Sequence, residues 1–147
     1  MPLPDHRIVR LAIGKAQPFS QAGSLTLQSA MVKGPVDALQ CQATIVAGDE
    51  HFDPKVHGGP NRVVHHIPAE SYEVLSRELP AGGFDAGVVH PGALGENVST
   101  TGLSPQDVCI GDVIQAGTAV LQVRCPVQAA PCGKGQAGPG VCGVRCV

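Results

Sequence analysis

The residues best suited to chemistry are concentrated in one stretch, residues 49–68, which holds four of the six histidines of the chain. A Gly58-Gly59-Pro60 turn lies inside it, between the cations Lys55 and Arg62. Backbone N–H groups at glycines can approach an anion closely, and a guanidinium group can bind its oxygens. The stretch therefore predicts an anion-binding loop. The alternative is a plain hairpin that carries surface histidines.

A short strand is predicted directly after this loop, over residues 63–67. The alternation of a strand places His65 on one face and His66 on the other. One histidine is therefore expected to point inward and one outward. A single inward histidine is more often a hydrogen-bonded core group than a ligand.

The clearest helix is predicted over residues 68–79, with Pro68 at its first position and an apolar stripe of Tyr72, Leu75 and Leu79 that packs in the core. Glycine and proline are abundant elsewhere, and aromatic residues are scarce. Strands are expected over residues 7–13, 41–46 and 118–124. The fold class is therefore mainly β, with one or two short helices.

Composition narrows the class of protein. The chain has 147 residues, which suits one domain, and its 43% hydrophobic content argues against disorder. A net charge of −2 gives no basic excess for nucleic acid. No apolar run is long enough for a membrane span, and no signal peptide is expected. These features predict a cytoplasmic globular domain.

The cysteines fall into two groups. Cys41 and Cys109 lie in apolar segments and are interpreted as buried thiols. The other four lie near the end of the chain: Cys125, Cys132, Cys142 and Cys146. Disulfides are not expected in a chain without a secretion signal. A zinc site at these four residues is an open alternative, although they form no C-x-x-C pair.

Several blocks of the chain occur in the order and spacing of a known family. They are Asp49-Glu50 with residues 55–70, Gly95-Glu96-Asn97 with the residues up to Leu103, residues 108–112, and Pro131-Cys132 with Lys134. Together they resemble the MOSC family, the molybdenum-cofactor sulfurase C-terminal domains, over about residues 7–134. The opening residues 13–18 resemble stand-alone bacterial members that act on N-hydroxylated bases such as 6-hydroxylaminopurine.

The resemblance implies a β-barrel-like MOSC domain that carries a molybdenum cofactor (molybdopterin). It also implies reduction of an N–O bond at the metal, with electrons from a separate partner protein. Cys132 matches the family cysteine that would ligate molybdenum, and a thiolate is a soft ligand suited to this metal. Cys125 stays an alternative, because one extra residue lies before Cys132 and Gly133 stands where the family has an aromatic residue.

The resemblance and the chemistry of the residues together indicate a cofactor site. The expected cofactor-binding residues are Lys15, Lys55, His57, Gly58, Gly59, Arg62, His65, Glu96 and Asn97. Asn97 is expected to bind the pterin or position the substrate, and Cys132 and Asn97 are the catalytic candidates. Glu96 has the same role or forms an ion pair with Arg62. Pyridoxal phosphate on Lys15 or Lys55 is a lesser alternative.

The C-terminal part departs from the family pattern. A MOSC core is expected over residues 1–134, followed by an irregular Gly- and Cys-rich tail over residues 135–147. This predicts a barrel that is incomplete at its C-terminus, through truncation or a frame shift. Two functions stay open: an oxidoreductase that reduces N-hydroxylated bases or related N–O compounds, and a non-catalytic carrier or binding module for the cofactor or its sulfur.

Overall fold

The computed structural model describes residues 5–19, 27–78, 89–104, 107–127 and 141–146. Within these residues the chain is mainly β, with two short helices, as the sequence predicts. The elements in order are β1 (Arg7–Ile13), β2 (Gln17–Phe19), β3 (Leu27–Ser29), β4 (Gly34–Pro35), α1 (Pro54–His57), β5 (Val64–Pro68), α2 (Ala69–Glu78), β6 (Val98–Thr101), β7 (Val113–Ala116), β8 (Ala119–Val127) and β9 (Val141–Cys146).

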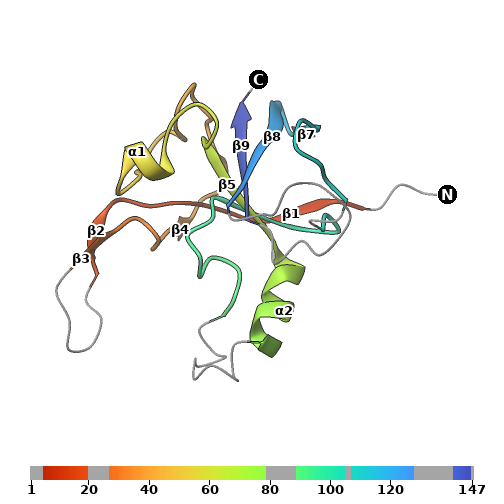
Figure 1. Cartoon of the computed structure of the whole chain (residues 1–147), viewed down its shortest axis with the longest axis horizontal. Coiled ribbons are helices and arrows are strands. Elements are labelled where there is room, and N and C mark those ends of the chain that lie inside the picture. Colours follow the sequence, from red (N-terminus) through yellow and green to blue (C-terminus); the bar gives the residue numbers. More distant parts are fainter. Residues whose placement is uncertain (1–4, 20–26, 79–88, 105–106, 128–140, 147) are drawn as a thin grey trace.

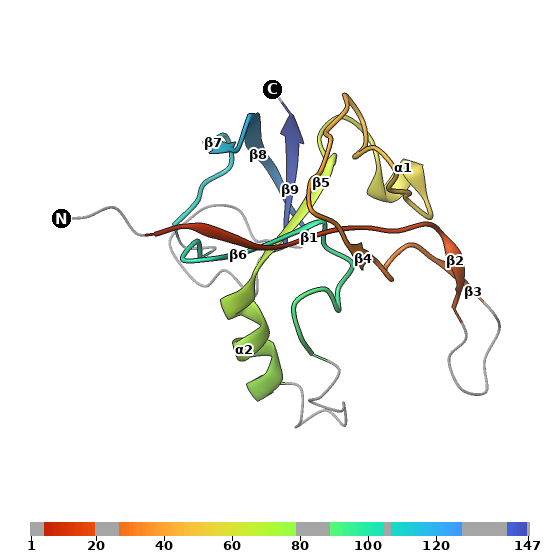
Figure 2. The same cartoon turned by 180° about the vertical axis from the view of Figure 1, so that it is seen from behind.

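Seven of the strands form one open sheet in the order β4-β1-β6-β5-β9-β8-β7. Neighbouring strands are antiparallel except β5 and β6, which are parallel and follow each other through α2. The sheet is strongly twisted, so that β1 and β6 run across the direction of β8 and β9 (Figure 1). The two helices lie toward opposite ends of β5, as the view from behind also shows (Figure 2).

The C-terminal tail contributes a strand to the middle of this sheet. Residues Val141–Cys146 form β9, which pairs with β5 on one side and β8 on the other. The expectation of an irregular tail is therefore wrong for these residues. Hydrogen bonding to two distant strands makes this segment a strand, and a local sequence pattern does not reveal such partners.

The strand predicted over residues 41–46 is also wrong, because this segment folds back on itself. Cys41 and Val46 form an isolated bridge, and the Gln42 amide donates to the Ile45 carbonyl at 2.9 Å. Other local predictions are confirmed: β1 spans residues 7–13, and α2 begins at Ala69, directly after Pro68 ends β5.

The core between these elements is small and β-branched. It consists of Val46, Val63, Val64, Val98 and Val123, with leucine and isoleucine side chains packed around it. Polar side chains are buried just as deeply, among them those of Asp49, Glu96 and Asn97. Buried polar groups must be hydrogen-bonded or paired, so the contacts of these three residues define the candidate site.

Candidate functional site

A buried ion pair lies at the centre of the site. The Lys33 ammonium lies 2.5 Å from Asp49 Oδ2, and the two side chains are 5% and 0% exposed. Asp49 Oδ1 accepts from the Gly14 amide at 2.8 Å, and Oδ2 accepts from Asn97 Nδ2 at 2.9 Å. Asp49 thus connects the end of β1, the segment before β4 and the start of β6.

Asn97 continues this network to the histidine strand. Its Nδ2 also donates to the Ala12 carbonyl at 3.1 Å, and its Oδ1 accepts from the His65 amide at 3.1 Å. The Asn97 amide in turn donates to the His65 carbonyl at 2.8 Å. The side chain is 1% exposed and already occupied by protein partners, so in this arrangement Asn97 positions β5 against β1.

Glu96 is fully buried and holds the loop before β6 onto α2. Tyr72 Oη donates to Glu96 Oε2 at 2.7 Å. Glu96 Oε1 accepts from Ser99 Oγ at 2.9 Å and from the Gly92 amide. Burial and the bond to Glu96 raise the pKa of the Tyr72 phenol, which keeps it a donor at neutral pH. Tyr72 therefore has a second role besides packing, because its hydroxyl group donates a hydrogen bond to a buried carboxyl group that would otherwise lack one of its partners.

His65 has a buried ring nitrogen without a partner among the described residues. Its Nδ1 lies 3.3 Å from the Gly95 carbonyl, which can only accept, so the proton is on Nδ1 and Nε2 is a hydrogen-bond acceptor. Nε2 is the buried, unpartnered atom. Burial lowers the pKa of His65, and this keeps the ring neutral at pH 7. A buried acceptor of this kind requires a hydrogen-bond donor, which a water molecule or a ligand can supply.

Arg10, which was not predicted from the sequence, carries a buried hydrogen-bond donor, whereas His65 carries a buried acceptor. Its Nη2 donates to the Lys33 carbonyl at 2.8 Å, while its buried Nη1 has no partner among the described residues. The guanidinium group lies against Gly92, where a Cβ would be 2.6 Å from Arg10 Cζ. Gly92 also has a φ of +102°, a left-handed backbone conformation that favours glycine at this position.

The two glycines of the Gly58-Gly59 turn differ in their surroundings. Gly58 is packed tightly against the first residue of α1, whereas Gly59 has open space beside it. Asp53 caps α1 by accepting from the Lys55 amide at 3.0 Å, and the Gly58 amide donates to the Pro54 carbonyl at 3.1 Å. A Cβ on Gly58 would lie 2.6 Å from that carbonyl oxygen. Gly59 has a φ of +97° with open space beside it, so its backbone is accessible to a ligand.

The predicted cations take different positions around this turn. Lys55 and His57 are exposed on α1, and Arg62 is half-buried. Lys15 is exposed and lies 3.2 Å from Glu50 Oε1, and Glu50 also accepts from the Ala16 amide. The four predicted cations therefore differ in exposure, and Arg62 is the least exposed of them.

We name the buried residues Lys33, Asp49, His65, Glu96 and Asn97 the polar cluster. Three of them were predicted as site residues, whereas Lys33 and Asp49 were not.

His57 is close enough to the polar cluster for its charge to affect the pKa of His65. Cys132 lies outside the described residues, so its place relative to the cluster stays a prediction. A lysine directly after the apolar run of residues 25–32 was the signal that could have identified Lys33.

His66 lies on the other face of β5 and is half-buried, as His65 is. Its Nε2 lies 2.8 Å from Thr100 Oγ1, and burial lowers its pKa from 6.5 to about 4. The prediction that one histidine of the pair points outward is wrong, because both are half-buried. Each face of β5 is covered, one by the polar cluster and the other by the β7–β8 side of the sheet.

This burial predicts a pH dependence of stability. The unfolded state binds a proton at His66 below about pH 6.5, while the folded state does so only near pH 4, so stability falls as the pH drops through this window. We expect wild-type protein to lose about 2–3 kcal/mol between pH 7 and pH 4 relative to His66→Gln, by urea unfolding. His57→Gln, at an exposed position, should follow wild type; parallel pH profiles for wild type and His66→Gln would contradict the prediction.

Fold and site together define an open-sheet β domain with a buried, charged network beside a glycine turn at one end. The model of the MOSC domain family matches residues 53–139, more than half of the chain. The chain belongs to the MOSC family, and the resemblance seen in the sequence is confirmed. Among the described residues no helix has the length and apolarity needed to span a bilayer.

Known proteins agree with this assignment. Protein YiiM of Escherichia coli (strain K12) is 36% identical over 82% of this chain and 50% of its own length. A protein named "Reductase" from Gibberella moniliformis is 35% identical over 78% of this chain and 19% of its own. A crystal structure of a hypothetical protein superposes with a TM-score of 0.61 at 31% identity, over 84% of this chain and 48% of that one. The chain spans about half the length of the bacterial relatives it matches.

Proposed function

We propose that this MOSC protein binds the molybdenum cofactor beside the polar cluster and serves as an oxidoreductase. Its substrates would be N-hydroxylated bases or related N–O compounds, and its electrons would come from a separate donor protein. The observation that carries the proposal is the buried Nε2 of His65, which has no partner within the described part of the chain and lies near the cation-rich Gly-Gly turn. The relative named as a reductase supports the reaction class.

The described residues fit a phosphorylated pterin. Such a ligand has ring N–H groups, and the Nε2 of a neutral His65 would accept a hydrogen bond from one of them. It also has phosphate oxygens, which require hydrogen-bond donors from the protein. The unpartnered Arg10 Nη1 is a buried donor of this kind. The accessible backbone at Gly59 and the exposed Lys55 and His57 would bind phosphate at the surface.

When bound, the cofactor would supply the two-electron chemistry that reduces the N–O bond. The protein's own residues would bind and orient it. Cys132 is the proposed molybdenum ligand. Asn97 and Asp49 hold the His65 backbone in place, and Glu96 with Tyr72 holds the neighbouring loop.

A second candidate function is a non-catalytic carrier of the cofactor. It is favoured by the contacts of Glu96 and Asn97, which are engaged within the protein and so anchor the site without being free to move protons. Pyridoxal phosphate finds less support, since Schiff-base lysines are usually desolvated and Lys15 and Lys55 are exposed.

The test compares protein made in hosts with and without molybdenum-cofactor synthesis. We expect molybdenum in proportion to protein only in the competent host, and reduction of 6-hydroxylaminopurine by that preparation with an added electron donor. Molybdenum without turnover would select the carrier. Equal metal content in the two hosts, or none in either, would exclude both forms of the proposal.

A further inference from the structure

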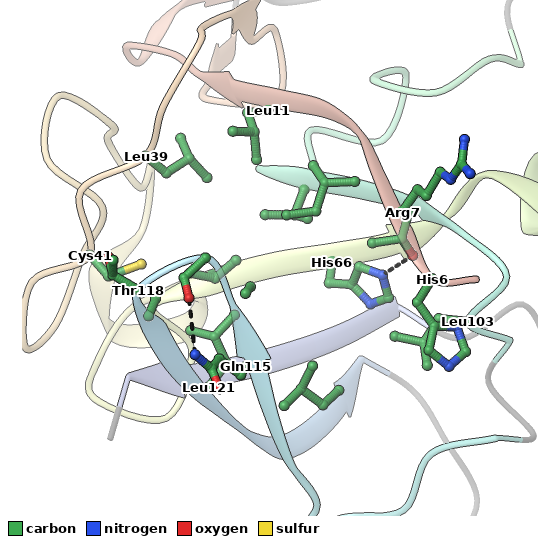
Figure 3. A pocket seen from close by; sticks show the side chains of 18 of the residues that line it. His6, Arg7, Leu11, Leu39, Cys41, His66, Leu103, Gln115, Thr118 and Leu121 are labelled. Atoms are coloured by element: carbon green, nitrogen blue, oxygen red, sulfur yellow. Dashed lines mark hydrogen bonds between the residues drawn. The ribbon is translucent and has the colours of Figure 1, made fainter. Parts of the chain in front are cut away.

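A cavity of about 530 Å³ lies on the face of β5 that carries His66 (Figure 3). His65 does not line it. Its walls come from β1, β5 and β6 on one side and from the β7–β8 hairpin and residues 37–41 on the other. None of the polar cluster lines it. Its volume is typical of small-molecule sites, which range from about 300 to 1,000 Å³.

The wall of this cavity is mostly apolar and incompletely covered. Leu11, Leu39, Ile114 and Leu121 pack against the valine core on one side but stay only partly buried, because their other side faces the cavity. Covering apolar surface of this kind with an apolar ligand is favourable, since it removes that surface from water. The cavity can therefore gain binding energy from a ligand with an apolar body.

The buried polar groups of the wall are uncharged. His66 Nε2 and Thr100 Oγ1 are bonded to each other at 2.8 Å, and burial keeps His66 neutral at pH 7. The charged lining side chains of Arg7 and Asp37 are exposed, and Arg7 is bound to Asp5. A charged group placed deep in this cavity would therefore have no opposite charge to pair with, which is costly.

We propose that this cavity binds an uncharged, largely apolar small molecule that forms one hydrogen bond with the His66–Thr100 pair. A flat aromatic ring system with a single hydroxyl group fits within this volume and has the required polarity. This site lies apart from the polar cluster and does not depend on any cofactor.

The first test measures binding of 2-naphthol and its charged analogue naphthalene-2-sulfonate by calorimetry. We expect one molecule of 2-naphthol per chain and at least about tenfold weaker binding of the sulfonate. Leu121→Trp places an indole in the cavity and should weaken 2-naphthol binding at least about tenfold. Val120→Trp is the matched control, because Val120 neighbours Leu121 on β8 but does not line the cavity and is 39% exposed. Equal affinity for the two probes, or unchanged binding in Leu121→Trp, would overturn the proposal.

The second test uses the wild-type protein and therefore does not depend on how the variants fold. Cys41 lines the cavity, while Cys109 is exposed and does not line it. Saturating 2-naphthol should slow the alkylation of Cys41 by N-ethylmaleimide several-fold and leave Cys109 unchanged, as followed by peptide mass spectrometry. Equal effects on both thiols would overturn the proposal. Protection of Cys41 that rises with protein concentration alone would also overturn it, and would assign the cavity to a second copy of the chain.

Discussion

Asp49→Asn is expected to destabilise the protein by about 3–5 kcal/mol, because it leaves the buried Lys33 charge without its partner. Asp49 also accepts from Gly14 and Asn97, so its replacement disturbs the contact between β1 and β6 as well. Burial already lowers the pKa of Lys33, against the opposing effect of Asp49. The loss should therefore be present at neutral pH and shrink as rising pH allows Lys33 to lose its proton. Urea unfolding at several pH values measures it.

Two further variants distinguish the effect of an unpaired Lys33 charge from a nonspecific loss of stability. Asp37→Asn removes an exposed carboxylate and should change stability by less than about 0.5 kcal/mol. Lys33→Met combined with Asp49→Asn removes both charges and should be clearly more stable than Asp49→Asn alone. The single variant Lys33→Met completes the comparison. If the double variant loses as much stability as Asp49→Asn and Lys33→Met lose together, the ion pair does not explain the destabilisation by Asp49→Asn.

Cys132→Ala is expected to lower the molybdenum content of the purified protein more than about tenfold while leaving the fold intact. The physical reason is that a thiolate is a soft ligand with strong affinity for this metal, and alanine offers no replacement. Metal content by mass spectrometry, in protein from a host that makes the cofactor, is the readout. Circular dichroism checks that the variant folds.

Cys125→Ala and Cys109→Ala are the controls for this variant. Cys109 is exposed and outside the matching Pro-Cys block, so its loss should not change the metal content. If Cys125→Ala loses molybdenum and Cys132→Ala keeps it, the ligand is Cys125. Full metal content in both variants would rule out a cysteine ligand at either position.

Local sequence patterns predicted where several elements lie along the chain. The first strand, the β-branched strand before Pro68 and the helix after it are confirmed, because the residue types and turn signals that indicate each one lie within or beside that segment. The short bridged turn at residues 41–46 and the strand β9 were predicted wrongly. Both depend on which segments pair, and pairing is decided by contacts between residues distant in sequence.

Some residues of the candidate site could be predicted from the sequence and others could not. His65, Glu96 and Asn97 were identified because they lie in blocks with family spacing, and membership of the MOSC family followed from those blocks. Burial could not be predicted for Lys33 and Arg10, since each is a single cation in an ordinary turn or strand. Their chemistry arises from desolvation and from partners distant in sequence, such as the Lys33 carbonyl that accepts from Arg10 and the Asp49 carboxylate that pairs with Lys33.

The sequence by itself therefore determined the family, the mainly β class and the identity of the glycine turn with its cations. Only the tertiary structure decided that Lys33 and Asp49 form a buried ion pair and that His66 faces a separate apolar cavity. It also decided that, among the residues the structure describes, the buried acceptor of His65 has no partner. The physical reason is that composition and spacing specify which groups a chain carries. Burial and pairing, which set the charge state and reactivity of those groups, exist only once distant strands are packed together.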